Sequence, residues 1–113
     1  MTSTKGFVVN NTGVPLTFVA DNDPDHGEVP TILLNSIDPG GEGTVFIANS
    51  DGAGVEGWVQ ANGNGAVWQL NYDNPVIGSN SGYVSKNPGT CNVGGGTNNT
   101  NTYTLNPSTT SKD

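Results

Sequence analysis

The sequence contains no arginine, and its 113 residues include only three lysines, Lys5, Lys86 and Lys112. Ten acidic residues bring the formal net charge to −7. Proteins that bind nucleic acid neutralise backbone phosphates with clustered Lys and Arg side chains. Because no such cluster exists in this sequence, we expect no nucleic-acid partner.

Side chains suited to catalysis are also scarce, since the chain has one histidine and one cysteine. His26 lies in an acidic segment, and no Gly-x-Ser-x-Gly turn is present to pair with it. Cys91 cannot form a disulfide within the chain, and no neighbouring cation activates its thiol. A zinc site normally needs more His and Cys ligands than these two. We therefore expect a protein that is not an enzyme and needs no cofactor.

The most charged segment, Asp21–Glu28, begins like a calcium-binding loop, with carboxylates at alternate positions. The likeness then ends, because Ile32 occupies the twelfth position, where a bidentate Glu is required. This pattern favours a solvated turn, so the sequence predicts no metal site.

Long apolar runs are absent as well. A membrane-spanning helix needs about 20 apolar residues, and a signal peptide needs a core of roughly 7–15. The apolar run near the start is only Phe7-Val8-Val9. We therefore expect no signal peptide, synthesis in the cytoplasm, and either release or action on target membranes from a water-soluble fold.

Glycine and proline are dense, and the longest stretch without either is residues 97–106. An average helix of about 11–12 residues does not fit uninterrupted between them. Short alternating segments separated by turn residues instead predict an all-β, single-domain antiparallel β-sandwich of about 7–9 strands over residues 1–106, with a flexible tail at 107–113. Asn62-Gly63 is the strongest hairpin signal. The expected strands are 5–10, 14–20, 29–35, 43–49, 55–61, 66–72, 82–86 and 100–105.

Alternation within these strands predicts which side chains face the core. Trp68, Leu70 and Tyr72 share one face of strand 66–72 and should be buried. Strand 55–61 is ambiguous, because Trp58 shares a face with Glu56 and Gln60. Either Trp58 faces solvent, or this strand packs the other way round.

Surface Asn, Thr, Tyr and Trp side chains can hydrogen-bond to, and stack on, either sugars or lipid headgroups. Composition alone does not choose between these ligands. The sequence from Gly54 onward is more specific. It reads Gly54-Val55-Glu56-Gly57, then two strands joined by a Gly-rich turn, then Tyr72-Asp73-Asn74-Pro75 and Gly78-Ser79-Asn80.

This arrangement resembles the aegerolysin family, particularly its bacterial branch, which includes the small components of binary insecticidal crystal toxins. Weaker similarity covers nearly the whole chain, including Asn10-Asn11-Thr12-Gly13 and the Asp38-Pro39-Gly40 turn. Val76 follows Pro75, whereas fungal members carry an aromatic residue there.

The resemblance implies a β-sandwich that recognises membrane lipids, often with a sphingolipid-type headgroup, and that permeabilises membranes together with a larger pore-forming partner. We expect a monomer or weak dimer. A soluble glycan-binding module is the alternative function, and the Asp73–Asn80 loop could instead serve only to close the fold. Surface aromatic residues complete the candidate ligand- or membrane-binding set, which is Glu56, Trp58, Tyr72, Asp73, Asn74, Pro75, Gly78, Ser79, Asn80 and Tyr83.

Overall fold

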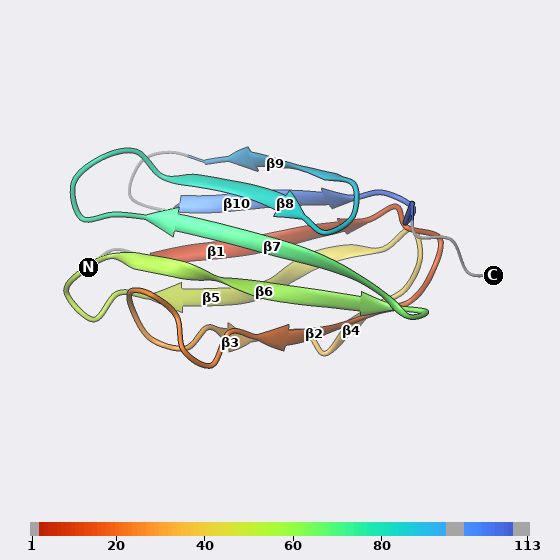
Figure 1. Ribbon diagram of the computed structural model, residues 1–113, viewed down its shortest axis with the longest axis horizontal. Helices are drawn as coiled ribbons and strands as arrows, with labels where there is room; N and C mark the ends of the chain where they lie inside the picture. Colours follow the sequence, from red (N-terminus) through yellow and green to blue (C-terminus); the bar gives the residue numbers. More distant parts are fainter. Residues whose placement is uncertain (1–2, 95–98, 110–113) are drawn as a thin grey trace.

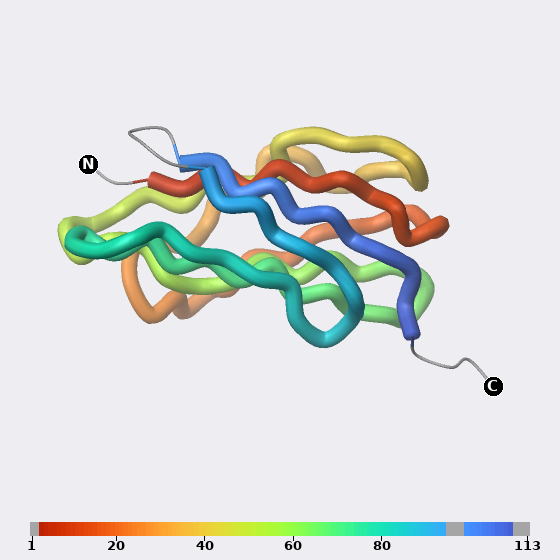
Figure 2. The backbone as a smooth tube through the Cα atoms, turned by 90° about the horizontal axis from the view of Figure 1, so that it is seen from above, coloured from red at the N-terminus to blue at the C-terminus, as the bar shows by residue number. Residues whose placement is uncertain are grey.

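The computed structural model describes residues 3–94 and 99–109, and these form an all-β sandwich of two five-stranded sheets (Figure 1). The first sheet has the order β3-β5-β1-β10-β9 and the second β4-β2-β6-β7-β8. Seen from above, the two sheets form separate layers (Figure 2). The strands are β1 (Ser3–Asn10), β2 (Leu16–Ala20), β3 (Thr31–Ile32), β4 (Ser36–Ile37), β5 (Glu42–Asn49), β6 (Val55–Gly63), β7 (Ala66–Asn74), β8 (Ser81–Ser85), β9 (Gly89–Val93) and β10 (Asn99–Leu105).

The all-β sandwich predicted from the sequence is confirmed, but the described residues form ten strands rather than about 7–9, with three differences from the expected set. Only the short strand β3 falls within the expected strand 29–35, and the equally short β4 follows it and belongs to the other sheet. Ile32 packs against the core from one sheet and Ile37 from the other. They are five positions apart, so a single strand with period two would turn them to opposite faces. The other two differences are β9, which was not expected, and the parallel pairing of β1 with β10 in an otherwise antiparallel fold.

The β6–β7 hairpin forms, but its turn is not at Asn62-Gly63. Asn64 and Gly65 have positive φ angles of 50° and 82°, and Gly63 pairs with Ala66. Gly63 lies in the strand, where an added Cβ would be 2.8 Å from Leu16 and Val14 side-chain atoms. Its lack of a side chain therefore serves packing, and the turn falls two residues later.

The core follows the predicted alternation of β7. Trp68, Leu70 and Tyr72 are at most 2% exposed, as expected. In β6 the inward residues include Val55 and Val59, so Trp58 lies on the outer face with Glu56 and Gln60. This settles the ambiguity of that strand in favour of a surface-facing Trp58. None of the described residues belongs to a helix that could cross a membrane.

The region predicted as a flexible tail begins with residues that contact the sandwich. Just before this predicted tail, the Trp68 indole donates a hydrogen bond of 2.9 Å to the Asn106 carbonyl. The Asn87 side-chain oxygen accepts hydrogen bonds from the Ser108 hydroxyl, at 2.9 Å, and the Thr109 amide, at 3.3 Å. Residues 110–113 lie outside the described part of the chain.

Candidate functional site

The outer face of β6, β7 and β8 carries an ordered set of side chains, because the register of these antiparallel strands brings them opposite one another. Trp58 pairs with Asn71, which pairs with Tyr83 on its other side. We call these three residues the aromatic row. One step nearer the β7–β8 loop, Glu56 pairs with Asp73 and Asp73 with Ser81. We call this second set the acidic row.

Hydrogen bonds hold the centre of the aromatic row in place. The Gln60 side-chain amide donates to Gln69 at 2.9 Å, and the Gln69 amide donates to the Asn71 oxygen at 2.8 Å. The Asn71 amide in turn donates to the Ser85 hydroxyl at 2.9 Å. Because Asn71 is bonded on both sides and almost buried, it forms a fixed floor between Trp58 and Tyr83.

The segment between β2 and β3 forms a wall beside these rows. The Asp21 amide donates to the Trp58 carbonyl at 3.0 Å, and the backbones of His26 and Glu56 exchange two hydrogen bonds. The Asp21 carboxylate also accepts the Asp23 amide at 3.0 Å, which stabilises the turn locally. These hydrogen bonds hold the segment between β2 and β3 against β6.

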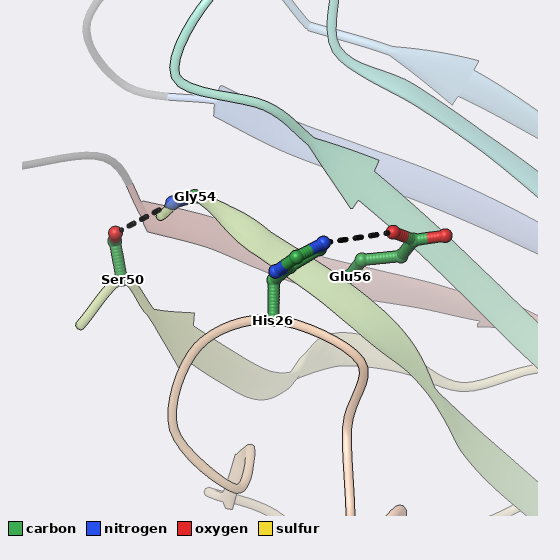
Figure 3. A network of polar contacts seen from close by, with 4 residues as sticks. All are labelled: His26, Ser50, Gly54 and Glu56. Atoms are coloured by element: carbon green, nitrogen blue, oxygen red, sulfur yellow. Dashed lines mark hydrogen bonds and ion pairs between the residues drawn. The ribbon is translucent and has the colours of Figure 1, made fainter. Parts of the chain in front are cut away.

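Together the rows and the wall enclose a groove of about 330 Å³. Five carboxylates contribute to its lining, and no Lys or Arg does so among the residues that the structure describes. The nearby basic group is His26, whose Nε2 lies 3.8 Å from Glu56 Oε1 (Figure 3). The lining residues are Asp21, Asp23, Asp25, Glu56, Gly57, Trp58, Asn71, Tyr72, Asp73, Ser81, Gly82 and Tyr83.

Two further contacts involve β6, the strand that carries Glu56 and Trp58 of the groove. The Ser50 hydroxyl accepts the Gly54 amide at 3.0 Å and orders the turn that leads into β6 (Figure 3). Tyr72 lies on the inner side of the sheet, where an added Cβ on Gly57 would be 2.7 Å from its hydroxyl. Burial, and secondarily the charge of Asp21, raise the pKa of Tyr72 far above its ordinary value. The Tyr72 hydroxyl is therefore neutral.

The structure brings together half of the site residues predicted from the sequence. Glu56, Trp58, Tyr72, Asp73 and Tyr83 all line the groove. Asn74, the last residue of β7, does not line the groove, and neither do Pro75, Gly78, Ser79 and Asn80 of the loop that follows it.

Asn74, at the end of β7, and Asn80, in the loop, hold the two ends of the loop in place by side-chain hydrogen bonds. Asn74 is buried, and its amide donates to Thr4 Oγ1 at 3.2 Å and to the Ser3 carbonyl at 3.3 Å. The Asn80 amide donates to Asn101 Oδ1 at 3.1 Å. Asn80 was expected to be free to meet a headgroup, but its amide connects β10 to the loop instead.

The tip of the loop, by contrast, is apolar and uncovered. Val76 is 60% exposed and Ile77 is 90% exposed, the largest fraction among the exposed large hydrophobic residues. Ser79 is also exposed. We refer to Val76 and Ile77 as the apolar tip.

Sequence reasoning missed seven lining residues, namely Asp21, Asp23, Asp25, Gly57, Asn71, Ser81 and Gly82. The alternating aspartates were noticed, but only as a possible calcium loop, and no group of three or more ligand side chains suited to a metal ion occurs within 3–94 and 99–109. Asn71 could have been found from the hairpin register, because it lies opposite Trp58.

No known family model matches this chain, and no curated protein matches it.

Proposed function

We propose that this protein is a non-catalytic module that binds the headgroups of membrane lipids. The observation that carries the proposal is the position of the apolar tip relative to the groove. Asp73 and Ser81 pair within the acidic row, and the loop of the apolar tip connects them directly. A membrane that contacts Val76 and Ile77 would therefore meet the open groove at the same end of the sandwich.

The side chains at this end suit the boundary between water and lipid. Trp and Tyr rings favour that boundary because one part of each ring is apolar and the other forms hydrogen bonds. The net charge of −7 opposes binding to anionic leaflets, where basic segments contribute about 1 kcal/mol per charge. With anionic leaflets disfavoured, membranes that present zwitterionic or sphingolipid-type headgroups are the expected targets.

The resemblance to aegerolysins supports the same assignment and extends it to a partner. In that family, lipid recognition precedes permeabilisation by a larger protein. We accordingly propose that this chain acts as the small component of a two-component cytolysin or insecticidal toxin.

Co-sedimentation with vesicles of sphingomyelin, phosphatidylcholine and cholesterol tests the proposal. The Val76→Ser/Ile77→Ser variant should bind these vesicles roughly thirtyfold more weakly, because burial of two aliphatic side chains contributes on the order of 2 kcal/mol. The control is Val19→Ser/Leu33→Ser, which removes two other exposed aliphatic side chains that lie outside the groove and its loop. Equal binding by both variants and the parent would reject the apolar tip as a membrane contact.

A soluble glycan-binding function is the second candidate. The amide network of Gln60, Gln69 and Asn71 beneath two aromatic rings supplies both stacking surfaces and hydrogen-bonding groups. Binding to immobilised glycans, together with failure to sediment with any vesicle, would favour this function over lipid recognition.

A further inference from the structure

We propose that Asn64, in the turn of the β6–β7 hairpin, is a site of spontaneous covalent modification, at which the side-chain amide is lost and isoaspartate or aspartate takes its place. This turn lies at the opposite end of the sandwich from the apolar tip (Figure 1). The modification is therefore independent of lipid binding and goes beyond the proposed function.

The reaction needs an asparagine that is followed by an unhindered backbone amide. The Gly65 nitrogen attacks Cγ of Asn64, so that a new C–N bond forms and the bond from Cγ to Nδ2 breaks. Ammonia leaves with the proton that the Gly65 nitrogen gives up, and a five-membered succinimide ring remains. Water then opens the ring, giving isoaspartate by attack at the main-chain carbonyl carbon or aspartate by attack at Cγ. Either product adds one negative charge to the net charge of −7.

The hairpin turn leaves the attacking amide free. Asn64 and Gly65 are both exposed, and both have positive φ angles. Gly65 belongs to neither strand, and its amide donates no hydrogen bond within the described residues. Nothing lies within 4 Å of the position that a Cβ on Gly65 would occupy. The backbone can therefore rotate to bring Cγ of Asn64 onto the Gly65 nitrogen without losing contacts, as is typical of loop tips.

The other Asn-Gly pair, Asn62-Gly63, has the same local chemistry but lies within β6. Gly63 is buried and pairs with Ala66 in the β6–β7 ladder. An added Cβ on Gly63 would be 2.8 Å from side-chain atoms of Leu16 and Val14. Ring closure at Asn62 would therefore require the strands to separate and this packing to open, which costs more free energy than a movement at a turn.

Asp51-Gly52 is the third pair of this kind in the sequence. Its attacking nitrogen is already engaged, because the Gly52 amide donates a hydrogen bond of 3.0 Å to the Ser50 hydroxyl. A carboxylate also has no amide group to lose, so ring closure and opening at Asp51 would leave the net charge unchanged. Asn64 is thus the position at which exposure, a free glycine amide and a reactive side chain coincide.

The test is incubation of the intact protein in mildly alkaline water enriched in heavy oxygen, followed by anion-exchange chromatography and peptide mass spectrometry. A more acidic species should accumulate, with heavy oxygen incorporated at position 64. Incorporation at position 62 should be at least about tenfold slower, because the paired strand opens more rarely than the turn. In denaturant the two positions should react at similar rates, since each asparagine then precedes an unhindered glycine.

Two variants complete the test. Asn64→Gly removes the amide but keeps a residue that adopts positive φ readily, so the acidic species should not form. The matched control, Asn62→Thr, removes the other Asn-Gly pair and should leave the rate of formation unchanged. Reaction at position 62 as fast as at position 64 in the native protein would overturn the inference. So would a native protein that stays unmodified at Asn64 under conditions in which the denatured chain reacts there.

Discussion

The two tryptophans have opposite environments, and single substitutions should separate their roles. Trp68 is 1% exposed and its indole is hydrogen-bonded to Asn106, whereas Trp58 lies on the outer face and lines the groove. Trp68→Ala should cost roughly 3–5 kcal/mol of unfolding free energy, and Trp58→Ala should cost well below that. Denaturant unfolding of both variants, followed by far-ultraviolet circular dichroism, measures the difference.

The two tryptophans also separate effects on ligand binding from effects on the stability of the fold. Trp58→Ala should lose ligand or vesicle binding while its unfolding midpoint stays close to the parent. A large loss of stability in this variant would mean that Trp58 completes the fold, and the assignment of the groove would then lose its main aromatic contact.

Sequence reasoning did not find β9, and the reactivity of Cys91 reports on how this strand is packed. Cys91 packs against the core from the edge of its sheet, and an added Cβ on Gly82 would be 2.9 Å from its sulfur. Burial raises the pKa of the Cys91 thiol from an ordinary value of 9.0 to about 11. The native protein should therefore be alkylated by iodoacetamide at pH 8 roughly a hundredfold more slowly than the unfolded chain, because about a hundredfold less thiolate is present.

The same pKa shift makes the free energy of unfolding depend on pH. Because the fold favours the neutral Cys91 thiol, this stabilisation is fully present below pH 9 and is lost as the pH rises toward about 11. Alkylation at equal rates with and without denaturant would show that β9 is not packed as the structure describes.

The strands also show what alternation can and cannot predict. Strands β1, β5, β6, β7 and β10 were located within two residues, because each contains β-branched or aromatic residues and is bounded by turn residues. By contrast, β9 has the sequence Gly-Thr-Cys-Asn-Val, in which the inward position is a half-buried cysteine and no periodic signal exists. The segment 29–35 failed for the opposite reason, since its apolar residues suggest a strand but only Thr31–Ile32 forms one, and Leu33 and Leu34 are exposed.

The candidate site could be predicted only where residues were local in sequence. Glu56, Trp58, Asp73 and Tyr83 were found from a motif and from surface aromatics. The wall formed by Asp21, Asp23 and Asp25 depends on the pairing of His26 with Glu56, which are thirty residues apart. Contacts of this range follow from the tertiary fold, so local patterns do not contain them.

At the scale of the whole molecule, the β7–β8 loop with the apolar tip lies at one end of the sandwich and the β6–β7 hairpin at the other (Figure 1). The groove residues Glu56, Asp73 and Ser81 lie on the side of the β7–β8 loop. Trp58 belongs to the groove, and Trp68 lies two residues from the hairpin end of β7. With a net charge of −7, attachment should depend on contacts at the groove end and should persist at high salt.

The most direct test is quenching of tryptophan fluorescence by sphingomyelin–phosphatidylcholine vesicles that carry a quencher at the headgroup level. The parent reports on both tryptophans, and Trp58→Phe reports on Trp68 alone. We expect strong quenching in the parent and little in Trp58→Phe, at both low and high salt. Equal quenching in the two proteins would contradict this expectation, because the membrane would then contact the molecule at the hairpin end or not at the groove.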